Sequence, residues 1–439
     1  MLPIILLLNF LIWTSFLYFY TGKYLPDSGR IMNAVISVNI SLAIFGMVYF
    51  LFLIFSLYFW IFLSFQSTCS VIIIYRNFST LIRRFNCRFL LSAIGIKLLL
   101  MLVSILVITI MFVESSKKYG DWDAWAIWNL RAKFLLSEDF WKNSLNPGLF
   151  WSHPDYPLML PSWIAIIWKS IGFPSFIVPM LLAYFIMLNI LLVLYSSVRI
   201  VCGELYGIII LVFLPLDFFF VAQSATQYAD TLLALFILIT FIIFNQNKNP
   251  SGFSYFLLGF FSASTGWIKN EGLLFFLVFS IFLLIRSRKE RTFYISYMYG
   301  AIVPLLIIII FKLFYAPPND LLQNQTVHVV FRNLNMTRLS ITGNYLLKII
   351  FSEFPILLPL LFLVVIFNPG YFFSFNGLII FIILFAYMLI YLCFARELEW
   401  LLKTSFDRLI HQYYLSFIYT SMISMCKLPP FCQPIGKIS

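Results

Sequence analysis

The sequence predicts an all-α fold, a polytopic bundle of transmembrane helices in one integral-membrane domain over residues 1–439. Of the 439 residues, 62% are hydrophobic and only 10% are charged, and the mean hydropathy is +0.97. Soluble globular proteins are about half apolar and a quarter charged. Apolar runs of membrane-spanning length recur along the whole chain, which favours a helical membrane protein over a soluble one.

Hydropathy predicts about twelve spans, and Lys and Arg residues in short loops orient them with both chain ends inside. The orienting residues are Arg76, Arg83, Arg84 and Arg88, then Lys248, and then Arg286, Arg288, Lys289 and Arg291. The first segment has no basic region and no small-residue cleavage site, so we expect a retained helix rather than a signal peptide. The predicted spans are approximately 2–20, 36–60, 90–113, 175–198, 205–221, 230–245, 253–268, 271–286, 293–315, 347–367, 375–394 and 409–426.

The segment 157–171 is apolar but short, and it contains Pro161 and Lys169. A crossing here would place one basic loop outside, so we predict an interfacial or re-entrant helix. Two long outer loops remain, an extracytoplasmic loop at 114–174 and a second at 316–346. Ordered loops of this length usually carry function.

The net charge of +12 is explained by basic cytoplasmic loops and by contact with lipid headgroups, and no basic stripe indicates nucleic-acid binding. The six cysteines show no zinc-site spacing. Five of them fall on or near the cytoplasmic side, where thiols stay reduced, so no disulfide framework is expected. The cysteines are Cys69, Cys87, Cys202, Cys393, Cys426 and Cys432.

In this topology the acidic residues collect on the outer side, and only Glu204 and Glu290 fall on the cytoplasmic side. His153, His328 and His411 also fall outside. Because acids were not used to orient the chain, this distribution indicates that any chemistry faces away from the cytoplasm.

The strongest candidate segment is 120–133, which follows the span at 90–113 and combines carboxylates, indoles and cations, Arg131 among them. Asp121 and Asp123 are two residues apart and would point to different faces of a helix, so they are not a paired acid and base. One could be a base and the other a metal ligand or structural acceptor. Alternatively, both could mark an acidic helix start. Trp122, Trp125 and Trp128 recur every third residue, which predicts one face of an interfacial helix.

Further candidates lie in four outer segments, each with a structural alternative. His153 and Asp155 could bind a metal ion, although no complete ligand set is visible. Tyr228 and Asp230 stand at the mouth of a span, where an Asp is also a common helix cap. Lys269 and Glu271 could simply neutralise each other. The segment from Arg396 to Arg408 offers guanidinium groups that suit phosphate, or it is an amphipathic surface helix.

Together these segments resemble the GT-C superfamily of integral-membrane glycosyltransferases, which includes the protein O-mannosyltransferases and the lipid A aminoarabinose transferases. The resemblance rests on motifs in a fixed order over residues 120 to 410. They are Asp121/Asp123, His153-Pro-x-Tyr-Pro157, Tyr228-Ala-Asp230, Thr265-x4-Asn270-Glu271-Gly272 with Lys269, and Thr404-Ser405-x-Asp407-Arg408.

The resemblance implies an inverting transfer of a hexosyl or pentosyl group from a polyprenyl-phosphate donor to a glycan, lipid or protein acceptor of the cell envelope. The transfer would take place at the outer face of the cell (inner) membrane. The family's loop carboxylate maps to Asp123 first and to Asp121 second, as the group that deprotonates or orients the acceptor hydroxyl. Arg408 and then Lys269 would stabilise the leaving phosphate. His153 could assist the donor or a divalent metal ion.

The chain departs from the family in two respects. Its acidic motif is Asp-Trp-Asp rather than adjacent Asp and Glu, and we expect no soluble outer domain after Met425. Three other hypotheses stay open: a flippase or transporter for a lipid-linked saccharide, a polymerase or ligase that moves a preassembled glycan, and a non-catalytic scaffold.

Overall fold

The computed structural model describes residues 1–84, 96–246, 251–286, 291–319, 332–354, 356–393 and 397–428, and all regular elements among them are helical. Eight of these helices are long and apolar enough to cross a membrane, or up to ten if each of two bent pairs is one span. The all-α prediction is confirmed, and the chain is a multi-pass membrane protein. The predicted number of about twelve spans is not reached by this criterion.

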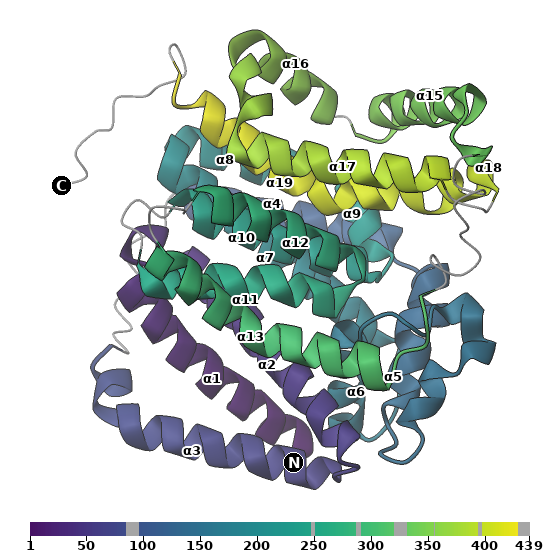
Figure 1. Cartoon of the computed structure of the whole chain (residues 1–439). Coiled ribbons are helices and arrows are strands. Elements are labelled where there is room, and N and C mark those ends of the chain that lie inside the picture. Colours follow the sequence, from purple (N-terminus) through teal and green to yellow (C-terminus); the bar gives the residue numbers. More distant parts are fainter. Residues whose placement is uncertain are drawn as a thin grey trace.

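The helices lie roughly parallel in one bundle, with short helices and loops gathered at one end (Figure 1). The first group is α1 (Leu2–Tyr24), α2 (Arg30–Ile54), α3 (Phe59–Arg84), α4 (Ile96–Ser115), η3 (Ala124–Asn129), α5 (Leu130–Phe134), α6 (Met159–Ile171) and α7 (Ile177–Cys202). The second is α8 (Glu204–Phe213), α9 (Phe218–Ala225), α10 (Ala229–Gln246), α11 (Gly252–Ile268), α12 (Glu271–Arg286) and α13 (Arg291–Phe314). The third is α15 (Met336–Ser352), α16 (Leu357–Phe367), α17 (Phe375–Cys393), α18 (Leu398–Leu401), η8 (Leu402–Phe406) and α19 (Asp407–Met425).

Helix α3 is an additional long apolar helix that the hydropathy analysis missed, because we assigned residues 61–89 to a cytoplasmic loop. Its segment Phe59–Asn77 has a mean hydropathy of 1.3, the lowest of the eight candidate spans. Polar residues such as Gln66, which is fully buried, lower the average of a helix that nevertheless packs against α1. The loop marked by Arg76 is therefore largely helical.

This extra helix reverses the predicted direction of α1. Phe10, in its first half, packs on Trp163 of α6, at the end of the bundle that carries the loop after α4. Tyr24, at its other end, packs on Phe253 at the start of α11. Helix α1 therefore begins at the loop-rich end, whereas α19 finishes at the opposite end (Figure 1). The start of α1 and the end of α19 thus lie at opposite ends of the bundle, which differs from the predicted arrangement with both chain ends inside. Lys23 and Arg30 lie at the end of the bundle opposite the loops.

Helix α10 is the central helix, with 89% of its residues buried, and it packs against α7, α11 and α19. Its apolar side chains belong to one continuous core that reaches from α1 to α19. The first turn of α10 carries Asp230. The most buried of the candidate spans in the described residues therefore presents a carboxylate at the loop-rich end.

The predicted span 205–221 is broken into α8 and α9, which meet at an angle of 61°. Pro215 lies at the break and cannot donate the backbone hydrogen bond that a continuous helix needs. Asp217 then caps α9, because its Oδ1 accepts from the backbone N–H of Phe220 at 3.2 Å. The hydroxyl of Tyr414 in α19 donates to the second oxygen of Asp217 at 2.5 Å.

Two other expectations change in detail. Helix α6, predicted to be interfacial or re-entrant, is short but largely buried, and it packs against α2, α5 and α7. The predicted loop 316–346 lies partly outside the described residues, and its end forms the start of α15. The predicted span 347–367 is divided between α15 and α16, which run in different directions (Figure 1).

Helices α11 and α13 cross so closely that two glycines are required. A Cβ atom on Gly259 would lie 1.8 Å from the backbone oxygen of Tyr297, and one on Gly300 would lie 1.8 Å from that of Phe256. Small residues allow such close backbone contact between membrane helices. The crossing fixes α11, whose end leads directly to Lys269.

Replacing Gly259 with alanine is expected to destabilise the protein by about 1–3 kcal/mol or more, because the added methyl group meets rigid backbone. Gly343→Ala is the matched control, since a Cβ there contacts nothing within 4 Å and alanine favours the interior of a helix. The melting temperatures of the two variants in lipid nanodiscs test this. Equal melting temperatures would show that the helix crossing tolerates a side chain.

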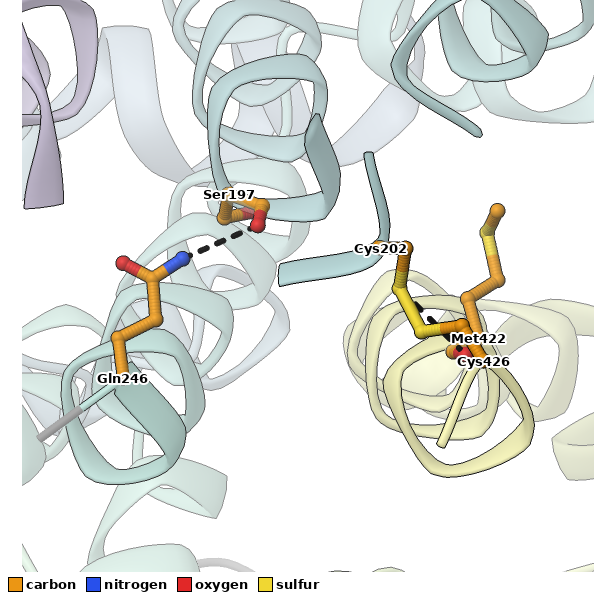
Figure 2. Close-up of a disulfide and its surroundings, with 5 residues drawn as sticks. All are labelled: Ser197, Cys202, Gln246, Met422 and Cys426. Atoms are coloured by element: carbon orange, nitrogen blue, oxygen red, sulfur yellow. Dashed lines mark hydrogen bonds between the residues drawn. A yellow bond between two sulfur atoms is a disulfide. The ribbon is translucent and has the colours of Figure 1, made fainter. Parts of the chain in front are cut away.

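The ends of α7 and α19 are joined by a disulfide between Cys202 and Cys426, with a Cα–Cα distance of 5.6 Å (Figure 2). This bond differs from the expectation of reduced thiols, which rested only on the predicted cytoplasmic location of these cysteines. The two cysteines are 224 residues apart in the sequence, so their pairing depends on the tertiary fold and could not be predicted from local sequence. Cys202 Sγ also lies 3.7 Å from the backbone oxygen of Met422, which is a contact rather than a hydrogen bond because a disulfide sulfur carries no proton.

Differential thiol labelling is expected to separate these two cysteines from Cys69 and Cys393, which are free. N-ethylmaleimide added to denatured, unreduced protein should modify Cys69 and Cys393, whereas Cys202 and Cys426 should react only after reduction. Both sulfurs belong to buried residues, which limits the access of reductants. Modification of Cys202 and Cys426 before reduction would instead support the expectation that these thiols stay reduced on the cytoplasmic side.

Candidate functional site

Four separate segments of the chain meet at the loop-rich end of the bundle and form a cluster of ionisable side chains. We call Asp123, Asp230, Lys269, Glu271 and Arg408 the charged cluster. Ion pairs join them in a continuous series, from Asp123 to Arg408, Asp230, Lys269 and Glu271. The cluster contains three carboxylates and two cations.

Asp230 is the centre of the cluster, and its side chain is only 2% exposed. Its Oδ1 accepts hydrogen bonds from Lys269 Nζ at 2.9 Å and from Gln412 Nε2 at 2.7 Å. Its Oδ2 accepts from Arg408 at 3.3 Å. These three hydrogen bonds occupy both oxygens of the carboxylate and fix the position of both cations.

Arg408 connects the cluster to the first outer loop. One terminal nitrogen lies 2.7 Å from Asp123 Oδ2, and the guanidinium carbon lies 4.6 Å from the centre of the Tyr228 ring. The ring face adds a cation–π contact. Among the described residues, Nε of Arg408 is buried and has no hydrogen-bond partner.

Lys269 lies between two carboxylates, 2.9 Å from Asp230 and 3.0 Å from Glu271. Burial alone would lower the pKa of Lys269, but these carboxylates outweigh it and raise the pKa above the usual value. The ammonium group is therefore charged at neutral pH. The second oxygen of Glu271 has no partner among the described residues.

The turn that presents Lys269 depends on Thr265 and Gly272. Lys269 adopts extended backbone between α11 and α12, and the Thr265 hydroxyl donates to the backbone oxygen of Gly272 at 2.8 Å. A Cβ at residue 272 would lie 2.1 Å from the backbone oxygen of Thr265. The Thr-x4-Asn-Glu-Gly motif therefore forms the tight turn that connects α11 and α12.

The first outer loop is held in place by a backbone contact with the segment before α10. Gly120 has a φ of +72°, and a Cβ there would lie 2.6 Å from the backbone oxygen of Thr226. The N–H of Asp121 donates to that oxygen at 3.2 Å, and the N–H of Asp123 donates to the Tyr228 hydroxyl at 3.3 Å. These contacts aim Asp123 at Arg408.

Two π-helical turns flank the charged cluster. Asp123 directly precedes η3, and Asp407 and Arg408 directly follow η8. Such turns are rare and occur frequently at functional sites. The wider turn also changes which side chains share a face, so it separates the three tryptophans.

The prediction of one tryptophan face is therefore wrong. Trp122 and Trp125 are exposed and pack edge to face, with ring centres 4.5 Å apart. Trp128 is fully buried and stacks on Tyr156, at 5.8 Å between ring centres. Two indoles thus remain at the surface while the third supports the site from within.

A second group of residues holds the segment 152–156 beneath the cluster. Arg131 is fully buried and donates to the backbone oxygens of Ser152, His153 and Tyr156. Burial lowers the pKa of Arg131 to about 10, which leaves it protonated at neutral pH. The Tyr156 ring stacks on His153 and lies 5.6 Å from Lys269.

Asp155 belongs to a neighbouring network rather than to the charged cluster. Its Oδ2 accepts from Asn270 at 2.6 Å and lies 3.7 Å from Lys312. Lys312 also donates to the backbone oxygen of Asp155 and to Asn270 Oδ1, each at 2.6 Å. This network ties α13 to the turn that carries Lys269.

The structure places the two loop aspartates in different surroundings. Asp123 contacts Arg408, whereas Asp121 pairs with Lys117 at the surface and is 34% exposed. Arg396 and His328 lie outside the described residues, and His411 is buried between Phe219 and Phe220. No group of three or more His, Cys, Asp or Glu side chains in the described ranges could hold a metal ion.

Sequence analysis overlooked two residues of the site. Gln412, one helical turn after Arg408, donates to Asp230, and Lys312 supports Asp155. A lysine within the predicted span 293–315 was an available signal, since a charge inside an apolar helix is a functional candidate. Gln412 carries no charge, so only the fold distinguishes it from an ordinary buried amide.

No protein-family model, curated protein or solved structure matches this chain. The function of the site is therefore interpreted from its own geometry and chemistry.

Proposed function

We propose that the protein is a GT-C-type glycosyltransferase, which moves a sugar from a polyprenyl-phosphate donor to an acceptor of the cell envelope at the outer membrane face. The observation that carries the proposal is the meeting of four distant segments in one charged cluster. Each segment is one of the motifs on which the resemblance rests. A purely structural role would not require all four to meet at a partly exposed point.

The chemistry needs an anion site and a base, and the cluster offers both. Arg408, whose side chain is 13% exposed, and Lys269 supply positive charge for the donor phosphate. Asp123 holds Arg408 through Oδ2, which leaves Oδ1 to accept a proton. Its side chain is 16% exposed, so an acceptor hydroxyl can reach it.

The proposed step is a single displacement with inversion. The acceptor oxygen forms a bond to the anomeric carbon as its proton passes to Asp123 Oδ1. The bond between that carbon and the phosphate oxygen breaks, and its electron pair stays on the phosphate. Arg408 and Lys269 stabilise the charge that develops there. Tyr156 stays neutral, because burial and the nearby Glu271 and Asp155 carboxylates raise its pKa well above the usual value.

The distribution of basic residues supports an outer location for the cluster. Lys23, Arg30, Arg199 and Arg286 lie at helix ends opposite the cluster. Cytoplasmic ends of membrane helices are rich in Lys and Arg. On this basis the cluster faces the extracytoplasmic side of the cell membrane.

The test is transfer of radiolabel from a panel of polyprenyl-phosphate monosaccharides by protein in lipid nanodiscs, with envelope extracts as acceptors. Arg408→Gln should lower turnover by about 10²- to 10³-fold, because one donor to the developing charge is lost. Lys403→Gln is the matched control, since Lys403 is a 66% exposed cation on the same segment. A wild-type protein that transfers no sugar from any donor would overturn the proposal.

A second candidate, transport of a lipid-linked saccharide, is favoured by the buried polar face of α19. Gln412, Ser416 and Thr420 recur every fourth residue, are fully buried, and extend from the charged cluster toward the opposite end. Polar residues inside a membrane frequently mark substrate pathways. Movement of a fluorescent lipid-linked saccharide across liposomes, without sugar transfer, would favour this function over the enzyme.

A further inference from the structure

A pocket of about 370 Å³ lies beside the charged cluster, between the outer end of α4 and helix α9. This size is within the usual range of small-molecule sites. Met111 and Phe218 form an apolar part of its lining, and polar side chains complete it. Only 17% of the α4 span is buried, so the helix beside the pocket is open to the bilayer.

The polar lining favours hydrogen-bond donors over anions. Glu114 and Asp121 contribute two carboxylates, and the single cation, Lys117, is already paired with Asp121. Thr226 adds a hydroxyl and Gln223 an amide. A phosphate would meet a surplus of negative charge, whereas the hydroxyl groups of a sugar would find acceptors.

The pocket shares structural elements with the charged cluster. Gln223 donates to Asp407 at 3.0 Å, and Asp407 directly precedes Arg408. The contact between the first outer loop and the segment before α10 contributes Asp121 to the pocket and Asp123 to the cluster. A molecule in the pocket would therefore lie next to the loop that carries the proposed base.

We propose that this pocket binds the saccharide headgroup of a membrane-embedded glycolipid, which is the acceptor. The inference rests on the proposed function and specifies its acceptor class. The apolar part of the lining receives the start of the lipid moiety, and the carboxylates receive sugar hydroxyls. Access from the bilayer favours this amphiphile over a protein acceptor.

Direct binding tests the pocket without any catalysis. Native mass spectrometry would measure retention of a glucosyl diacylglycerol, and of phosphatidic acid as an anionic comparison, on the full chain released from nanodiscs. Ala222→Phe fills the pocket and should abolish retention of the glycolipid, whereas Val212→Phe, on exposed α8, should not. Equal retention by all three proteins, or preferential retention of phosphatidic acid, would overturn the proposal.

Kinetics provide the second measurement, with a variant that changes only one polar group. Glu114→Gln should raise the acceptor KM about tenfold, equivalent to one lost hydrogen bond of about 1.4 kcal/mol, and leave hydrolysis of the donor unchanged. An unchanged KM would count against the pocket. If no donor is turned over but glycolipid retention still depends on the pocket, the proposed function fails and the saccharide site stands.

Discussion

Lys269→Met is expected to destabilise the protein by about 3–5 kcal/mol, the usual penalty for leaving one partner of a buried ion pair unpaired. The side chain of Lys269 is 2% exposed and contacts both Asp230 and Glu271. Without the ammonium group, the buried carboxylate of Asp230 would keep only Arg408 as an ion-pair partner, and Glu271 would lose its ion pair. The melting temperature of the protein in nanodiscs, measured without substrate, would show the loss.

The control and the rescue distinguish charge from packing. Lys403→Met removes an exposed cation and should leave the melting temperature unchanged, because exposed ion pairs contribute little. Adding Asp230→Asn to Lys269→Met should recover part of the stability, since the uncompensated carboxylate is then neutral. A double variant no more stable than Lys269→Met would contradict the electrostatic explanation.

The pH dependence follows from the raised pKa of Lys269. A cation whose pKa is higher in the folded state contributes fully below its unfolded pKa, and the contribution is lost as the pH rises through the folded value. The ordinary pKa of a lysine side chain is 10.5. The contribution of Lys269 to the free energy of unfolding should therefore be constant around neutral pH and should decline only at pH values above 10.5. The difference in melting temperature between wild type and Lys269→Met should show this profile.

Asp123→Asn is expected to lower the rate of sugar transfer by about 10²- to 10⁴-fold, the usual contribution of a positioned base. The amide retains the size of the side chain and an oxygen for Arg408, but it cannot accept the acceptor proton. Donor binding should therefore persist while turnover falls. Single-turnover transfer from the radiolabelled donor separates these two quantities.

Glu399→Gln is the matched control for this variant, because Glu399 is a 64% exposed carboxylate at the same end of the bundle. It should retain the wild-type rate. Full activity of Asp123→Asn, with the melting temperature unchanged, would exclude Asp123 as the base and leave only a structural role for its contact with Arg408.

Much of the candidate site could be predicted because charges are conspicuous in an apolar chain. Asp123, Asp230, Lys269 and Arg408 were each visible as ionisable residues next to predicted spans, and the fold brings them together. Their partners could not be assigned, since ion pairs such as Arg408 with Asp123 join residues that are distant in sequence. Asp121 and Asp123 are near neighbours, and only the docking of the loop separates their surroundings.

The sequence by itself determined the helical membrane class, because a bilayer requires backbone hydrogen bonds to be satisfied within each apolar segment. It also determined most helix positions, since hydropathy is a local property. The tertiary structure decided that α3 is a long helix of the bundle, how α1 is directed, and which cysteines pair. These depend on packing between distant segments: a polar residue such as Gln66 lowers local hydropathy, yet the neighbouring helices bury it.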